Sequence, residues 1–128
     1  MSTLNNPEPA PRVDDAGPEC WPAVFAELGR FIPPEVAELM RERDAQGRVK
    51  YGVPLRVWDG RDAIVDPLQE AMDLLVYLQR ALMRVPPPDP RRWSPYHLHD
   101  KLRLLRGEAL RMVVALHDLH GDVPRERP

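Results

Sequence analysis

The stretch DPLQEAMDLLVYLQRALMR, residues Asp66 to Arg84, decides the fold of this chain. Aspartate followed by proline is a common helix start, because the carboxylate can cap the first turn and proline suits the first helical position. The residues that follow are apolar on almost every side of the predicted helix, which is typical of a buried helix. Yet Glu70 and Asp73 stand inside it, three residues apart, so both carboxylates project from one side. Two buried carboxylates require a cation between them, and a divalent metal ion is the candidate.

The composition is that of a cytoplasmic protein with one domain. The 128 residues carry a net charge of −2, which does not favour a nucleic-acid-coating protein, so we expect no stable nucleic-acid partner. The single cysteine, Cys20, excludes an intrachain disulfide and a cysteine-based zinc site. No apolar run reaches the roughly 20 residues of a membrane span, and the first residues lack the pattern of a signal peptide. We therefore expect a cytoplasmic location and no membrane contact.

Sixteen prolines divide the chain into segments with helical periodicity. We expect helices over Cys20–Ile32, Pro33–Gly47, Asp66–Arg84 and Ser94–Gly121, with Gly47 and Gly121 as stops. The segment Gly47–Gly60 is predicted to be a loop with a short extended piece at Leu55–Trp58, and Val85–Arg92 a stiff connector. No strand or repeat is evident, so the fold class is all-α, a bundle of about four helices. We expect a flexible N-terminal arm over residues 1–17, a single domain over 18–121 and a C-terminal tail over 122–128.

A second acidic pair, Glu35-x-x-Glu38, lies on the predicted helix that begins at Pro33. Taken alone, such a pair is usually part of a solvated face. Short connections favour antiparallel packing, however, and this packing can bring the pair opposite Glu70 and Asp73. Four converging carboxylates call for about two divalent ions, and ligation by oxygen alone selects Mg²⁺ or Mn²⁺.

Cationic and aromatic side chains accompany the acidic pairs. Tyr77 and Arg84 follow Glu70 by seven and fourteen residues, so they share its face, and Arg80 lies at the margin. The loop between the acidic helices carries three cations that could hold an anionic ligand: Arg48, Lys50 and Arg56. An ordinary solvated loop is an equal interpretation. Trp21, Trp58 and Tyr77 are candidates for lining the site, although Trp21 is most simply a core residue.

Other kinds of site fit poorly. Di-iron bundles use Glu-x-x-His pairs, and no histidine here follows a glutamate by three residues. Phosphate-binding loops, nucleophile elbows and dinucleotide-binding turns are absent, and nothing around Cys20 suggests a nucleophile.

The paired E-x-x-E and E-x-x-D motifs resemble those of the MazG-type all-α nucleotide pyrophosphohydrolases. More narrowly, KYGVPL (Lys50–Leu55) and GRDAIVDPLQEAMDLLVYLQRAL (Gly60–Leu82) look like the phage MazG-like branch called MazZ. The resemblance covers residues 33 to 84. The chain departs from the commoner E-E-x-x-E form, because Pro34 stands where the first glutamate would be.

The resemblance implies hydrolysis of a nucleoside triphosphate to the monophosphate and pyrophosphate. The expected substrate is dGTP, with GTP as a second, and the dGMP released would supply 2-aminoadenine nucleotide synthesis in a phage. It also implies a homodimer or homotetramer and two or three Mg²⁺ or Mn²⁺ ions per site. Four residues would hold these ions: Glu35, Glu38, Glu70 and Asp73. The substrate phosphates would contact Lys50, Arg80 and Arg84. The alternative is a non-catalytic helical module that binds metal or a partner protein for regulation.

Overall fold

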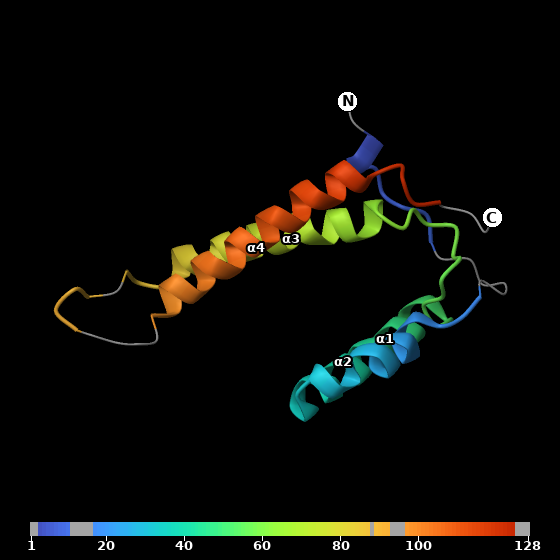
Figure 1. The fold of residues 1–128 in the computed structure, drawn as a ribbon, viewed down its shortest axis with the longest axis horizontal. Helices are drawn as coiled ribbons and strands as arrows, with labels where there is room; N and C mark the ends of the chain where they lie inside the picture. Colours follow the sequence, from blue (N-terminus) through green and yellow to red (C-terminus); the bar gives the residue numbers. More distant parts are fainter. Residues whose placement is uncertain (1–2, 11–16, 88, 93–96, 125–128) are drawn as a thin grey trace. The chain divides into compact units, whose positions relative to one another are not determined.

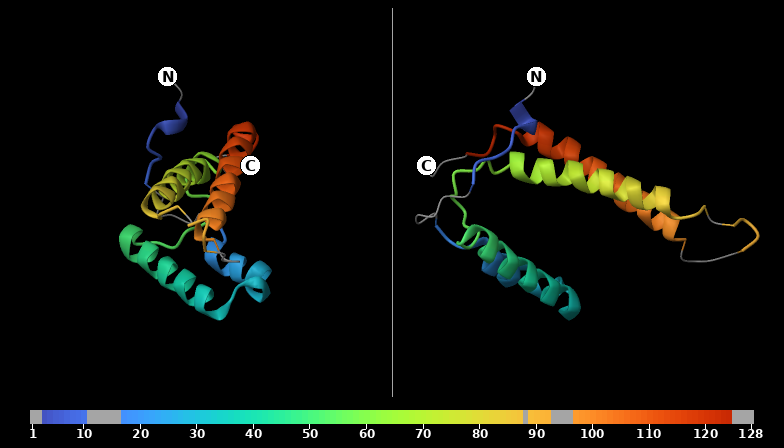
Figure 2. Two further views of the ribbon diagram at one scale, coloured as in Figure 1. Left: turned by 90° about the vertical axis from the view of Figure 1, so that its left-hand side faces the viewer. Right: turned by 180° about the vertical axis from the view of Figure 1, so that it is seen from behind.

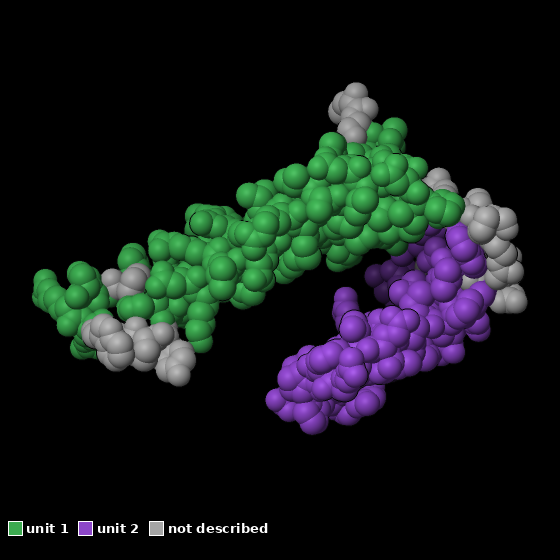
Figure 3. All heavy atoms as spheres, in the orientation of Figure 1, with its two compact units in different colours: residues 1–7, 62–124 green, residues 8–61, 125–128 purple. Residues whose placement is uncertain are grey.

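The computed structural model describes residues 3–10, 17–87, 89–92 and 97–124. Within these residues, every secondary-structure element longer than one residue is a helix. The helices are α1 (Cys20–Leu28), α2 (Pro34–Tyr51), α3 (Val65–Arg84) and α4 (Leu98–Leu119), with short 3₁₀ turns η1 (Thr3–Asn5) and η2 (Gly29–Phe31) (Figure 1). The predicted all-α fold of about four helices is thus confirmed. The chain divides into two compact units, coloured separately in Figure 3. Unit 1 comprises residues 1–7 and 62–124, and unit 2 comprises residues 8–61 and 125–128.

Unit 1 is built on an antiparallel hairpin of α3 and α4, which lie side by side in each view (Figures 1 and 2). Near the connector, His99 Nε2 lies 3.1 Å from the carbonyl oxygen of Val85. Further along, Arg106 donates a hydrogen bond of 2.7 Å to the Gln79 side chain. The buried residues of the hairpin are apolar: Val65, Leu68, Ala71, Leu82 and Ala109. Ala109 is fully buried, because a small side chain allows α4 to approach α3 closely.

The start of α3 differs from the prediction. The helix begins at Val65, and Asp62 rather than Asp66 supplies the capping oxygen. The Asp62 carboxylate accepts hydrogen bonds from the backbone N–H groups of Ile64 (2.8 Å) and Val65 (2.9 Å). These N–H groups have no partner inside the helix, so the earlier aspartate satisfies them.

Within a single copy of the chain, α3 is not buried on all sides. The buried residues lie on the stripe that faces α4, and Val76 and Tyr77 are 64% and 53% exposed. Leu74 and Met83 are exposed as well. At about 100° per residue, Glu70, Asp73 and Tyr77 lie on the side of α3 opposite the buried Leu68 and Ala71. The helix is therefore amphipathic, with a polar and aromatic outer face.

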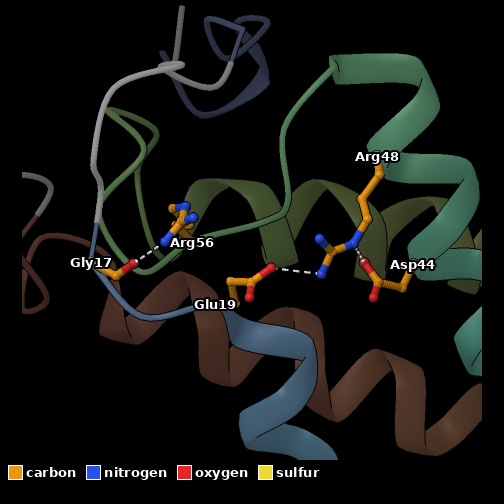
Figure 4. A network of polar contacts seen from close by, with 5 residues as sticks. All are labelled: Gly17, Glu19, Asp44, Arg48 and Arg56. Atoms are coloured by element: carbon orange, nitrogen blue, oxygen red, sulfur yellow. Dashed lines mark hydrogen bonds and ion pairs between the residues drawn. The ribbon is translucent and has the colours of Figure 1, made fainter.

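Unit 2 joins α1 and α2 through polar contacts (Figure 4). The Arg48 guanidinium bonds Asp44 one turn earlier on α2 (3.0 Å) and Glu19, which precedes α1 (2.6 Å). The predicted extended piece at Leu55–Trp58 is present, because Cys20 N–H bonds the Leu55 carbonyl and Val57 N–H bonds the Pro18 carbonyl. An isolated bridge between Glu19 and Arg56 lies between these two bonds.

Gly47 does not end α2, contrary to the prediction. The helix continues to Tyr51 and ends at Gly52, which has a φ of 74° and bonds the Arg48 carbonyl through its N–H. The left-handed conformation at Gly52 is one that other residues adopt at a cost. The predicted loop therefore begins five residues later, and Lys50 lies in the last turn of the helix.

The last predicted helix is present but shorter than predicted, because the described residues His97 and His120 flank it in non-helical conformations. Its predicted start at Ser94 lies outside the described residues, and α4 runs from Leu98 without interruption through Gly107. It ends at Leu119, two residues before Gly121, which has a φ of 91°. The single-domain boundaries at 18 and 121 stay a prediction. None of the helices in the described ranges has the length and hydropathy needed to cross a membrane.

The two glycines at the end of α2 give a matched test of the helix boundary. Gly47→Ala should stabilise the protein by about 1 kcal/mol, because alanine is the better helix former and its Cβ meets nothing within 4 Å. Gly52→Ala should destabilise it by about 1–2 kcal/mol, because alanine is strained at a positive φ. Urea unfolding followed by circular dichroism measures both changes. Shifts of the same sign would contradict the helix end at Gly52.

Candidate active site

The outer face of α3 carries the first predicted acidic pair. Glu70 and Asp73 are exposed, and neither makes a hydrogen bond or ion pair with the described part of the chain. Three residues of helix separate them by about 4.5 Å along the axis. Because α4 covers the opposite side, the packing of α3 directs both carboxylates outward. Two close, uncompensated carboxylates form a suitable partial ligand set for a hard divalent cation.

The second acidic pair lies in the first two turns of α2. Glu35 and Glu38 are both exposed, and Glu35 lies where the helix dipole favours negative charge. Glu38 has a neighbour in Arg41 at 3.7 Å, and both side chains are more than half exposed. A solvated pair of this kind contributes little, so Glu38 can exchange Arg41 for another cation at small cost.

The two acidic pairs belong to different units, α3 to unit 1 and α2 to unit 2. Within the described residues, no three histidine, cysteine, aspartate or glutamate side chains are grouped so that they could hold a metal ion. The convergence of all four carboxylates therefore stays a prediction. The donor chemistry of each pair fits Mg²⁺ or Mn²⁺, since carboxylate oxygens are the ligands these ions prefer.

Cationic and aromatic side chains continue the outer face of α3 beyond the carboxylates. The Arg80 guanidinium lies over the Tyr77 ring, 4.9 Å from its centroid. Such stacking orients the guanidinium and leaves its N–H groups available for an anion. Arg84 is exposed one turn later, in the last turn of the helix. The carboxylates, the aromatic ring and both arginines thus share one face of α3, as predicted.

The candidates on unit 2 have mixed environments. Lys50 is exposed and lies over the Tyr51 ring at 5.1 Å. Trp21 is half-buried and stacks on Phe25 with ring centroids 6.4 Å apart, an arrangement that suits a core residue. Trp58 is half-buried as well.

The other two cations of the predicted basic loop have structural partners. Arg48 bonds Glu19 and Asp44, and Arg56 donates a hydrogen bond of 2.8 Å to the Gly17 carbonyl (Figure 4). In unit 2, these contacts favour a structural role for both arginines over phosphate binding. Lys50 remains the candidate for that role.

Sequence reasoning missed Gln69, the residue directly before Glu70. Its side-chain amide donates hydrogen bonds to the carbonyl oxygens of Leu4 (2.9 Å) and Asn6 (2.8 Å). The N-terminal turn is thereby held against α3, in the same unit as the acidic pair. No signal in the sequence could have indicated this contact, because both acceptors are backbone carbonyls, which every residue has.

The comparisons with known proteins return nothing: no protein-family model, curated protein or solved structure matches this chain.

Cys20 has the environment of a poorly reactive thiol. It is half-buried at the start of α1, and burial, followed by the negative charge of Asp59, raises the pKa of the Cys20 thiol. A raised pKa lowers the thiolate fraction at neutral pH, and the thiolate is the reactive form. This agrees with the prediction that Cys20 is not a nucleophile.

Thiol labelling provides a pH-dependent test of this environment. Native Cys20 should react with a disulfide reagent at pH 7.5 several-fold more slowly than after denaturation, and the difference should shrink as the pH rises through the raised pKa. Asp59→Asn should speed the reaction, because it removes the charge and keeps an oxygen that can accept the Arg61 N–H bond. Equal rates in the native and denatured protein would contradict the raised pKa.

Proposed function

We propose that this chain is a metal-dependent nucleoside triphosphate pyrophosphohydrolase that releases the monophosphate and pyrophosphate. Its expected substrate is dGTP, with GTP as a second, and in a phage the dGMP would supply 2-aminoadenine nucleotide synthesis. The observation that carries the proposal is the outer face of α3, where unpaired Glu70 and Asp73 precede Tyr77, Arg80 and Arg84. The choice of dGTP rests on the resemblance of the Gly60–Leu82 segment.

Mg²⁺ or Mn²⁺ would be held by Glu70 and Asp73, with Glu35 and Glu38 of α2 as the further ligands that the resemblance implies. When bound, such an ion supplies neutralisation of phosphate charge and a water molecule of lowered pKa. Either Glu38 or Glu35 would orient a water molecule for in-line attack on the α-phosphorus. The bond from that phosphorus to the bridging oxygen would break, and pyrophosphate would leave.

The cations would bind the remaining phosphates. Arg80 is already oriented by its stacking on Tyr77, so little entropy is lost when its N–H groups bond phosphate oxygens. Arg84 and Lys50 would stabilise the negative charge that develops on the β- and γ-phosphates as pyrophosphate leaves.

Two properties of unit 1 support a homodimer or homotetramer. Both helices of the hairpin expose large apolar residues, among them Val76 on α3 and Leu104 on α4, each 64% exposed. The charges are also segregated along the hairpin. Apart from the proposed site residues Glu70, Asp73, Arg80 and Arg84, residues 77–106 have five cationic residues and two acidic ones, whereas residues 62–76 and 107–124 together have five acidic residues and one arginine. Antiparallel association of two hairpins would bury apolar surface and pair opposite charges.

The proposed activity is tested by incubating the protein with each dNTP, and with GTP, in Mg²⁺ or Mn²⁺. We expect the monophosphate and pyrophosphate as products. Asp73→Ala should lower kcat at least a hundredfold and weaken Mn²⁺ binding measured by electron paramagnetic resonance, because it removes a proposed ligand. The circular dichroism spectrum should not change, because Asp73 is exposed.

Asp100→Ala is the matched control for Asp73→Ala. It removes an exposed carboxylate of α4 whose ion-pair neighbour is Arg103 at 3.6 Å, and it should leave turnover unchanged. If no nucleotide yields the monophosphate and pyrophosphate, the proposed activity is wrong, and the non-catalytic helical module is the alternative. Near-normal turnover by Asp73→Ala would exclude the α3 face as the site.

Association should depend on salt, because it would pair charged ends of the hairpins. Light scattering after size exclusion should give a dimer or tetramer at about 0.1 M salt and more monomer at about 1 M. Arg103→Glu should weaken association at low salt, and adding Asp118→Arg should restore part of it by reversing the opposite charge. A monomer under all conditions would contradict the proposed assembly.

A further inference from the structure

The Gln69 side chain of α3 holds the N-terminal turn through two hydrogen bonds. Asn6 N–H bonds the Thr3 carbonyl at 3.0 Å and closes the turn. The Gln69 amide then uses both of its N–H bonds, one to the Leu4 carbonyl and one to the Asn6 carbonyl. We call residues 3–7 the N-terminal strap. Figures 1 and 2 show it in dark blue beside the end of the hairpin where α3 begins.

The N-terminal strap borders the acidic face of α3. Gln69 directly precedes Glu70, and at about 100° per residue Asp73 lies only about 40° around the helix from Gln69. Gln69 is half-buried whereas Glu70 and Asp73 are exposed, so the strap lies at the edge of the outer face and leaves the carboxylates open.

The order of groups along α3 gives a bound nucleotide a direction. Arg80 lies seven residues after Asp73, about 10 Å further along the helix, and Gln69 lies four residues before Asp73. In a nucleoside triphosphate, the β- and γ-phosphates and the nucleoside lie on opposite sides of the α-phosphate. If metal at Glu70 and Asp73 holds the α-phosphate and Arg80 holds the outer phosphates, the nucleoside extends toward the strap.

We infer that the N-terminal strap forms the base-side wall of the nucleotide site, and that Asn5 and Asn6 hydrogen-bond the edge of the base. This inference rests on the proposed function. Both asparagines are exposed, and each carboxamide offers an N–H donor and a carbonyl acceptor, the two kinds of group that a base edge presents. Gln69 is a positioning residue in this arrangement, because it acts through the strap.

The strap variants should change the choice of base more than the chemical step. The Asn5→Ala/Asn6→Ala variant should lower the ratio of kcat/KM between the best and the poorest dNTP by about fivefold for each hydrogen bond lost. Gln69→Leu, which keeps the side-chain size and removes both donors, should lower the same ratio through KM. Mn²⁺ binding should be unchanged in both variants, because the carboxylates are intact.

Gln79→Leu is the matched control. It makes the same substitution on the same helix and breaks a bond to Arg106 of α4, but it does not touch the strap, so it should leave the dNTP ratio unchanged. Hydrogen exchange of residues 3–7 should rise in Gln69→Leu and not in Gln79→Leu.

The outcomes separate the two proposals. If the wild-type protein is active, and both the asparagine variant and Gln69→Leu keep its ratio of kcat/KM between the best and the poorest dNTP, the role of the strap is overturned. The proposed function would still stand. A wild-type protein that hydrolyses no nucleotide would overturn both. A dNTP ratio lowered equally by Gln79→Leu would mean that hairpin stability, and not the strap, sets the preference, which also overturns the inference.

Discussion

The packing of one stripe of α3 against α4 is the constraint on which the rest of unit 1 depends. Leu68 is 2% exposed on α3 and Ala109 is fully buried on α4, so each helix has a covered stripe, and this packing fixes the rotation of α3 about its axis. With the rotation fixed, Glu70 and Asp73 must face outward, because they lie on the other side of the helix. Burial of the stripe removes apolar surface from water, whereas burial of these carboxylates would cost free energy. Burial of the apolar stripe therefore both stabilises the hairpin and leaves the acidic face exposed to solvent.

The existence and number of the helices could be predicted from the sequence, because apolar spacing and proline placement are local signals. Helix ends were less predictable. Gly47 and Gly52 are both plausible stops, and α2 passes Gly47 and ends at Gly52. Asp62 and Asp66 are both plausible caps for α3, and the backbone path before Val65 selects Asp62. Helical periodicity alone does not distinguish between the two candidates at either helix end.

Some features of the candidate site could likewise be predicted from the sequence, and others could not. The shared face of Glu70, Tyr77 and Arg84 follows from helical periodicity, so it was accessible before the structure. The convergence of that face with Glu35 and Glu38, which the sequence also predicts, stays a prediction, because these two residues belong to a second unit. The contact between Gln69 and the carbonyls of Leu4 and Asn6 could not be predicted for a different reason: its acceptors are backbone carbonyl oxygens, which do not depend on residue type. Side-chain patterns in a sequence identify the faces of a helix, but they do not identify the residues that pack against those faces.

The bonds from Gln69 to Leu4 and Asn6 span 65 and 63 residues, which sets an order on folding during synthesis. A ribosome adds roughly 5–20 residues per second, so the first turn of the chain waits several seconds before Gln69 exists. These bonds cannot form before Gln69 has left the ribosome, so the earliest residues to be synthesised are among the last of their unit to reach native contacts of this kind. A peptide fused ahead of Thr3 would lie beside the acidic face of α3 once the strap is in place. An affinity tag is therefore better placed at the other end of the chain.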